Sequence, residues 1–274
     1  MRFFVALLLR MTSENIGSGW TLPGKRAFYN DGYGYMRLIV FGDVHANIVA
    51  LERCYEEAMR HEPDRIIHLA DLGGYAPFVN EVTEFMVEHR IEGVQGNYDF
   101  NVAHETEDCG CKYEDPVQAE LSHVSFEWTK AHTSSKNKKY MKDLPFSIRL
   151  EAAGKRIHIF HATPVANNLY WYEERSEKFY RRMTKKADAD VLIFGHTHKP
   201  FRRELDGKVF INAGSVGKPK DDNPQTGFVL IDVDNTEIKS RFIWLDYDVE
   251  KVASAIIKAG LPPLFAEKLR VGSG

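Results

Sequence analysis

This chain of 274 residues has few cysteines, little excess of negative over positive charge and few long apolar runs. The three cysteines, Cys54, Cys109 and Cys111, are too few and odd in number for a disulfide framework, so we expect a reducing, cytoplasmic setting. A net charge of −3 argues against a surface built to hold nucleic acid or anionic lipid non-specifically. The apolar run near the N-terminus stops at Arg10, so it is too short to span a bilayer.

The N-terminal segment shows no sustained helix or strand period. Its apolar run, MRFFVALLLR, is followed by residues rich in Gly, Ser and turn formers, without a convincing signal-peptide cleavage pattern. We expect residues 1–35 to be an N-terminal extension that is disordered or not translated. The predicted domain covers residues 36–246, and residues 247–274 should form a helical tail that packs on it.

From Met36 onward, apolar runs and amphipathic stretches alternate. RLIVFG (37–42), RIIHLA (65–70) and IEGVQG (91–96) have the composition of buried strands. Residues 47–62 and 77–90 carry apolar side chains at helical spacing. Strand, helix, strand, helix, strand at this spacing is typical of βαβ units, so the chain is predicted to be an α/β protein with a parallel core.

The remainder of the chain has a less regular pattern. Residues 147–164 are predicted to form a hairpin that turns at Ala153 and Gly154, and residues 133–139 a polar loop. The other predicted elements are helices at 115–132 and 170–187, strands at 190–198, 208–215, 227–233 and 238–247, and two short helices in the tail.

Polar side chains stand at five of the predicted strand ends. Glycine precedes three of these ends, where it lets the backbone turn sharply or approach another group closely. In parallel α/β sheets, ligands bind beyond the carboxyl ends of the strands, so these side chains should meet at one edge. The residues are Asp43, His45, Asp71, Asn97, Asp99, His161, His196 and His198.

Spacing and chemistry together predict a metal site there. Side chains two residues apart in an extended segment point the same way, so Asp43 with His45, and His196 with His198, can each face one cavity. One such pair alone is more often a surface feature, but its repetition at successive strand ends favours metal ligands. Carboxylate oxygens mixed with imidazole nitrogens suit Mn²⁺, Fe or Zn²⁺. So many donors exceed one tetrahedral site and fit two ions, about 3.5–4 Å apart, that share a carboxylate.

Five ordered motifs, GDVH, ADLGGY, GNYD, HATP and GHTH, followed by NAGSVGKPK, resemble in order and spacing those of the calcineurin-like metallophosphoesterases, especially the small prokaryotic phosphodiesterases. The resemblance covers most of residues 36–246. It implies a four-layer αββα sandwich, in which two mixed sheets are flanked by helices. It also implies two divalent metal ions, with manganese as the first candidate and iron, zinc, nickel or magnesium as alternatives.

The resemblance further implies a ligand set for each ion, with Asp71 bridging the two. The first set would be Asp43, His45, Asp71 and His198. The second set would be Asp71, Asn97, His161 and His196.

Three positions depart from the family pattern. Ala70 and Ala162 replace glycines, which should leave the neighbouring ligands in place. Tyr98 replaces a histidine that, in the family, helps to protonate or stabilise the leaving group and is oriented by the next carboxylate, here Asp99. We therefore expect Asn97, Tyr98 and Asp99 to be the catalytic residues. A phenol with a pKa of about 10 is a poor acid near neutral pH, and a general acid contributes about 10²–10⁴-fold, so the change should slow catalysis. A packing role without chemistry is an equal alternative for Tyr98.

The predicted reaction is hydrolysis of a phosphate ester by a metal-bound hydroxide. A small phosphodiester or nucleotide is favoured over a phosphomonoester or a phosphoprotein, because the chain lacks an obvious peptide-docking insert. Candidate substrate-binding residues are Asn168, Arg175 and Lys218. For Lys218 and Lys220 a solvated loop is the alternative, since charged residues usually face water.

Other readings stay open at this stage. The aromatic residues 170–172 are interpreted as packing rather than as a base-stacking platform. Cys109 and Cys111 are interpreted as buried or idle thiols rather than as a further metal site with His104. The alternative function is a catalytically weak scaffold or binding protein, such as the phosphoesterase-like subunit of retromer. A DNA nuclease is disfavoured by the net charge and by the lack of a basic stripe, and assembly into a homo-oligomer is left open.

Overall fold

Alternate side chains of the first strand, β1 (Met36–Phe41), face two different cores. Ile39 and Phe41 pack against helices, whereas Leu38 and Val40 pack against a second sheet. This alternation follows from the two-residue period of a strand. The chain is seen in a computed structural model, which describes residues 34–111 and 115–273; the predicted N-terminal extension lies outside the described residues except for its last two.

Each of the two sheets has five strands and mixes parallel with antiparallel pairs. The first contains, in spatial order, β10 (Ile238–Leu245), β9 (Thr226–Val233), β1, β2 (Arg65–His68) and β3 (Glu92–Gly93). The second contains β4 (Ser147–Ala152), β5 (Lys155–Phe160), β6 (Val191–Phe194), β8 (Lys208–Asn212) and β7 (Phe201–Leu205). In the first sheet β1, β2 and β3 run parallel, and in the second β5, β6 and β8 do.

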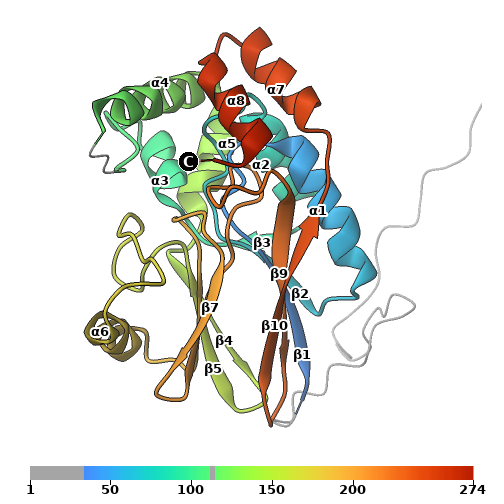
Figure 1. Cartoon of the computed structure of the whole chain (residues 1–274), viewed down its shortest axis with the longest axis vertical. Coiled ribbons are helices and arrows are strands. Elements are labelled where there is room, and N and C mark those ends of the chain that lie inside the picture. Colours follow the sequence, from blue (N-terminus) through green and yellow to red (C-terminus); the bar gives the residue numbers. More distant parts are fainter. Residues whose placement is uncertain (1–33, 112–114, 274) are drawn as a thin grey trace, which may run out of the picture. The chain divides into compact units, whose positions relative to one another are not determined.

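Helices cover the outer face of each sheet. The helices are α1 (Ile48–Arg60), α2 (Val79–Glu88), α3 (Asn97–Ala103), α4 (Pro116–His132), α5 (Ser135–Asp143), α6 (Glu177–Ala187), α7 (Val249–Lys258) and α8 (Pro263–Val271). Figure 1 shows the sheets face to face, with α1 beside the first and α6 beside the second. Helices α3, α4, α5, α7 and α8 gather at the upper strand ends (Figure 1).

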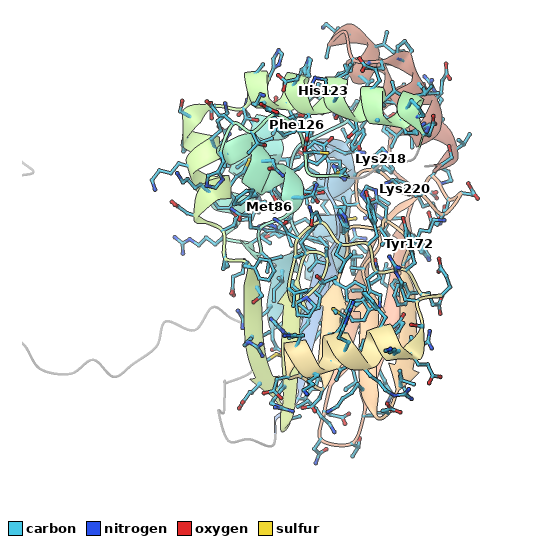
Figure 2. The ribbon with its side chains drawn as sticks, turned by 90° about the vertical axis from the view of Figure 1, so that its left-hand side faces the viewer. Met86, His123, Phe126, Tyr172, Lys218 and Lys220 are labelled. Atoms are coloured by element: carbon cyan, nitrogen blue, oxygen red, sulfur yellow. The ribbon has the colours of Figure 1, made fainter. Side chains whose placement is uncertain are left out.

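Three layers of buried side chains hold this arrangement together. The first lies between the first sheet and its helices, and Met86 of α2 and Phe126 of α4, both labelled in Figure 2, belong to it. The second fills the space between the sheets. The third joins the second sheet to α6 through Trp171 and Tyr180. The predicted four-layer αββα sandwich of two mixed sheets is therefore confirmed.

The predicted polar loop at 133–139 is wrong, because a helix, α5, begins at Ser135. Ser134 caps it by accepting a hydrogen bond from the Asn137 amide. The buried Asn137 side chain then donates to Asn80 at 2.9 Å, and Met141 enters the core. The tertiary contacts of Asn137 and Met141 thus stabilise helix α5, although its polar composition is typical of a loop.

Three other elements differ from their predicted extents. The third strand is reduced to Glu92–Gly93, and the helix predicted over 170–187 begins only at Glu177, after the Ser176 cap. The edge strand β7 is an element that the sequence pattern did not reveal. The predicted hairpin turn at Ala153 and Gly154 is confirmed, since β4 and β5 pair on either side of it.

The C-terminal segment contributes two helices to the core. Val252 and Ile256 of α7, and Phe265 and Leu269 of α8, are buried in the layer beside the first sheet. Within the described ranges, no helix is long and apolar enough to cross a membrane.

Candidate metal centre

The polar residues predicted at the strand ends are brought together by both sheets. They follow β1, β2, β5 and β6 directly or within a few residues, and Asn97 opens α3. Each is at most 4% exposed, so the cluster is buried. Two groups of ligand-type atoms form, and within each group the atoms lie within 4.8 Å of one another: Asp43, His45 and His198, and Asp71, His161 and His196.

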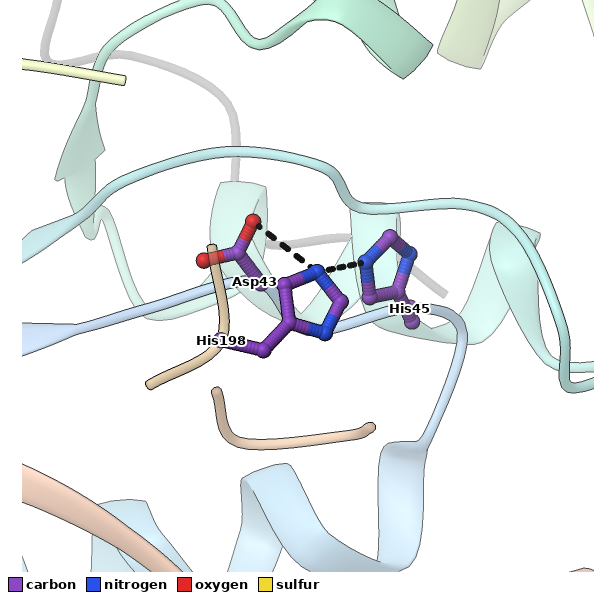
Figure 3. Close-up of side chains that lie close together, drawn as sticks. All are labelled: Asp43, His45 and His198. Atoms are coloured by element: carbon purple, nitrogen blue, oxygen red, sulfur yellow. Dashed lines mark hydrogen bonds and ion pairs between the residues drawn. The ribbon is translucent and has the colours of Figure 1, made fainter. Parts of the chain in front are cut away.

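In the first group, two imidazoles face each other through their Nε2 atoms (Figure 3). His45 Nε2 and His198 Nε2 are 3.0 Å apart, and Asp43 Oδ1 lies 3.6 Å from His198 Nε2. His45 Nδ1 donates to the Gly73 carbonyl at 2.8 Å and His198 Nδ1 to the Lys218 carbonyl at 2.5 Å. A carbonyl can only accept, so both protons sit on Nδ1 and both Nε2 atoms present lone pairs to the same point.

The second group repeats this arrangement. His161 Nδ1 donates to the Leu69 carbonyl at 2.6 Å, which leaves a lone pair on Nε2. That atom lies 3.0 Å from Asn97 Oδ1, 3.1 Å from His196 Nδ1 and 3.6 Å from Asp71 Oδ2. Acceptor atoms therefore converge again.

The two groups adjoin each other through their carboxylates. Asp71 Oδ2 is 3.6 Å from His161 Nε2 in its own group and 4.0 Å from His45 Nε2 in the other. Asp43 Oδ1 is likewise 4.0 Å from His161 Nε2. Asp71 Oδ2 thus faces an imidazole nitrogen of each group.

The electrostatics of the cluster fit divalent cations. Burial raises the pKa of Asp43 to about 7 and that of Asp71 well above its usual range, and it lowers the pKa of His45, His196 and His198 well below theirs. Asp43 Oδ1 is buried without a hydrogen-bond partner. Burying converging lone pairs and a carboxylate oxygen without a hydrogen-bond partner costs free energy unless a cation lies among them. The donor set therefore fits a pair of metal ions.

The backbone around these side chains is strained. Positive φ angles, rare for residues with a Cβ and costing about 1–3 kcal/mol each, occur at five members of the cluster. These residues are Asp43 (30°), His45 (45°), Asp71 (48°), His196 (68°) and His198 (61°). Such strain persists where surrounding contacts over-determine it, and it is concentrated at functional sites.

Two glycines make room for the carboxylates. A Cβ on Gly96 would lie 2.2 Å from Asp71 Oδ1, and one on Gly195 would lie 2.6 Å from Asp43 Oδ2. The amides of Tyr98 and His196, which follow these glycines closely, donate to the same oxygens at 3.0 and 2.9 Å. Close approach of the backbone is therefore what orients both carboxylates.

Asp99 holds the loop that carries Asp71. Its Oδ2 accepts from the amides of Asp71 and Gly96 at 2.9 and 3.0 Å, and its Oδ1 accepts from the Leu72 amide at 3.0 Å. The backbone of Asp71, rather than a histidine side chain, is thus what this carboxylate orients.

Tyr98 points into the helical layer. Its ring is 1% exposed and packs against Phe126, and its hydroxyl donates to Ser125 Oγ of α4 at 3.3 Å. The Tyr98 and His45 rings form a T-shaped pair, with centroids 5.5 Å apart. This placement favours packing beside the first group over proton donation to a leaving group.

The predicted substrate-binding residues have different surroundings. Asn168 donates from Nδ2 to the Gly110 carbonyl at 3.2 Å. The exposed Arg175 turns back to its own segment, where it donates to the Tyr170 carbonyl and lies over the Phe179 ring. Lys218 is joined to the first group by its carbonyl, which accepts from His198.

Two further segments lie beside the second group. The ring of Tyr170, a candidate for the pocket wall from its position after His161, lies 4.4 Å from that of His196, whereas Trp171 is a core residue as expected. Sequence reasoning missed the contact made by the cysteine segment. Asn97 Nδ2 donates to the Cys109 carbonyl at 2.8 Å and to Cys111 Sγ at 3.2 Å. The cysteine segment therefore orients Asn97 rather than standing idle, and the nearby GNYD motif was the only available hint.

The fold, two mixed five-stranded sheets flanked by helices, is that of the calcineurin-like phosphoesterases. Residues 36–236 match the sequence profile described as the calcineurin-like phosphoesterase superfamily domain. The chain belongs to this superfamily, as its motifs predicted.

Relatives extend the comparison over most of the chain. The uncharacterized protein MJ0912 of Methanocaldococcus jannaschii is 26% identical over 253 residues, which cover 86% of this chain and 98% of that protein. A metallophosphoesterase from Sphaerobacter thermophilus is 24% identical, with a TM-score of 0.71 over 87% of this chain and all of its own. The hypothetical protein PH1004 from Pyrococcus horikoshii is 18% identical, with a TM-score of 0.72 over 87% of this chain and 98% of its own. These two structures share the fold.

Proposed function

We propose that this protein hydrolyses small phosphate esters at a dinuclear metal centre, with phosphodiesters or nucleotides as substrates and manganese as the metal. The observation that carries the proposal is the convergence of acceptor atoms from two adjoining groups, with Asp71 facing both. Asp43, His45, Asp71 and His198 would hold one ion, and Asp71, Asn97, His161 and His196 the other.

The metal pair, when bound, supplies a lowered pKa for a reacting water and offsets charge on the phosphoryl oxygens. The chain's own residues supply rigidity. Carbonyls of Gly73, Leu69 and Lys218 fix the tautomers of His45, His161 and His198, so that Nε2 is available as a ligand atom. Asp99, through the Asp71 amide, keeps the shared carboxylate in place.

Protonation of the leaving group is the weak point of this site. The family histidine is replaced by Tyr98, whose hydroxyl contacts Ser125 in the helical layer. We infer that the leaving group departs without a general acid at this position, so that substrates with good leaving groups are preferred.

The test is hydrolysis of bis-p-nitrophenyl phosphate and p-nitrophenyl phosphate by the full chain, reloaded with Mn²⁺ or treated with a chelator. Asp71→Asn should abolish manganese-dependent turnover, because the shared carboxylate loses its charge. Asp143→Asn makes the same chemical change on the exposed side of α5 and should retain wild-type rates.

The alternative reading, a scaffold that keeps the fold and little activity, predicts a different result. A chain that binds two ions yet hydrolyses neither ester would support it, and activity gained in Tyr98→His would then locate the defect at that position. Faster cleavage of the monoester than of the diester would overturn the proposed substrate preference alone.

A further inference from the structure

A short cysteine segment, in which Gly110 separates Cys109 from Cys111, lies against Asn97, a proposed ligand of the second ion. The side-chain nitrogen of Asn97, Nδ2, donates to the Cys109 carbonyl at 2.8 Å and to Cys111 Sγ at 3.2 Å. An amide nitrogen only donates and an amide oxygen only accepts, so these contacts fix which end of the side chain faces the cysteines. Asn97 Oδ1 is thereby turned to the second group, where it lies 3.0 Å from His161 Nε2.

The two cysteine side chains are also close to each other. Gly110 between them has a φ of 72°, a left-handed conformation that glycine adopts readily. The Cys111 amide donates to Cys109 Sγ at 3.4 Å, and the two side chains hydrogen-bond to each other. Sulfur atoms already in contact can be joined by changes in the side-chain torsions, without the backbone movement that distant cysteines need.

Solvent reaches this pair, in contrast to the third cysteine. Cys111 is partly exposed, whereas Cys54 is fully buried and its thiol contacts Thr226 Oγ1 at 3.1 Å. Thiols that respond to oxidants are accessible and are often accompanied by a second cysteine that completes a disulfide. Cys111 has both properties, with Cys109 as the second cysteine.

We propose that hydrogen peroxide oxidises Cys111 and Cys109 to a reversible disulfide, and that this disulfide weakens the second metal site. The inference rests on the proposed function, because Asn97 is a metal ligand only within it. The cysteine segment is then a modification site that controls how many ions the chain holds.

Two displacement steps form the disulfide. In the first, Cys111 Sγ bonds to one peroxide oxygen, the O–O bond breaks, and the other oxygen leaves with that electron pair and takes the thiol proton. In the second, Cys109 Sγ bonds to Cys111 Sγ, the S–O bond breaks, and the departing hydroxide takes the Cys109 thiol proton. The two thiols lose two electrons and two protons, and hydrogen peroxide is reduced to two molecules of water.

The disulfide removes part of what orients Asn97. A covalent S–S bond is much shorter than a hydrogen-bonded contact, so at least one sulfur must move. The partly exposed Cys111 is freer to move than Cys109, whose buried sulfur lies 3.4 Å from Ser122 Oγ. Asn97 is fully buried, so losing the Cys111 acceptor leaves Nδ2 under-satisfied, and Oδ1 is no longer held toward the second group.

The first ion should be retained after oxidation. The two imidazoles of the first group, His45 and His198, are oriented by the carbonyls of Gly73 and Lys218, which belong to other segments of the chain. Oxidation should therefore act on one ion of the pair.

The experiment treats the metal-free full chain with hydrogen peroxide, removes the excess, and measures thiols and metal binding on the same sample. Peptide mass spectrometry should show the loss of two hydrogen atoms from the tryptic peptide that contains Cys109 and Cys111, while Cys54 can still be alkylated after denaturation. Titration with Mn²⁺ should show the first ion bound as in the reduced chain and the second bound about 10–100-fold more weakly, the effect of losing a group that orients a ligand. Dithiothreitol should restore the affinity for the second ion.

Three variants separate the disulfide from other oxidative damage. Cys111→Ser keeps an acceptor beside Asn97 but cannot form the bond, so peroxide should leave its second-ion affinity at the untreated value. Cys111→Ala removes that acceptor, so its second-ion affinity should be low without peroxide. Cys54→Ser removes the buried thiol and should respond to peroxide as wild type does.

Two results would overturn the inference. One is a peroxide-treated chain in which Cys109 and Cys111 can both still be alkylated, and the other is an unchanged second-ion affinity in a chain whose mass shows the disulfide. Failure of the proposed function is visible separately, because the reduced chain would then bind fewer than two ions before any peroxide is added.

Discussion

His45 Nε2 and His198 Nε2 lie 3.0 Å apart, and both imidazoles donate their Nδ1 protons to backbone carbonyls. Two lone pairs held face to face by rigid backbone are repulsive unless a cation or a shared proton lies between them. The backbone carbonyls therefore hold the two imidazoles in a geometry that favours a bound metal ion. This relationship, repeated around His161, is the physical basis of the proposed centre.

Metal binding should release protons below neutral pH. Burial raises the pKa of Asp43 to about 7, so this carboxyl is largely protonated at pH 6 and must ionise before it can bind a metal ion. The neighbouring histidines, whose pKa values are lowered by burial, are already neutral and release nothing. Mn²⁺ affinity should fall about tenfold for each pH unit below 7 per proton released.

Calorimetry in two buffers of different ionisation enthalpy measures this release. The expected result is at least one proton per chain at pH 6 and markedly less at pH 8. Equal Mn²⁺ affinity at pH 6 and at pH 8 would mean that Asp43 is ionised at both pH values or is not a metal ligand.

Asp99→Asn should weaken metal binding although Asp99 contacts no predicted metal ligand atom. The carboxylate accepts from three backbone amides, and an amide side chain would place an NH₂ group against at least one of them. We expect a stability loss of about 1–3 kcal/mol and a fall in Mn²⁺ affinity of about 10–100-fold. Denaturant unfolding of the metal-free chain and titration with Mn²⁺ measure the two effects separately. Unchanged affinity in a destabilised variant would show that Asp71 does not depend on this support.

Tyr98→Phe should change turnover of bis-p-nitrophenyl phosphate by less than about threefold. The hydroxyl contacts Ser125 of α4, so its removal should cost about 0.5–1.5 kcal/mol of stability and little catalysis. A donor role predicts instead a loss of about 10²–10⁴-fold. Ser125→Ala, which removes the partner of the hydroxyl, is the matched comparison for the stability effect.

The ligand-bearing strand ends were predictable from sequence because a strand that stops in glycine and polar residues leaves a local pattern. Asp43 with His45, and His196 with His198, are such patterns, and βαβ alternation places them at one edge. The tautomers of the histidines were not predictable, because the carbonyls that fix them come from distant segments. Gly73 and Lys218 lie 28 and 20 residues from the imidazoles they bind.

Elements that depend on few tertiary contacts were missed for the same reason. Helix α5 is polar in composition and is fixed by Asn137 and Met141. The contact of Cys111 with Asn97 depends on how a loop of irregular sequence folds back over α3. Neither leaves a period or motif in the sequence, so only the three-dimensional arrangement reveals them.

Electron paramagnetic resonance of the chain titrated with Mn²⁺ tests the central claim most directly, because two ions that share a carboxylate are exchange-coupled. A dinuclear centre predicts a coupled spectrum that reaches its maximum at two ions per chain. It also predicts that Asp71→Asn loses the coupling, while Asp143→Asn retains it. Saturation at one ion, or two ions without coupling in the wild-type chain, would contradict a dinuclear centre built on Asp71.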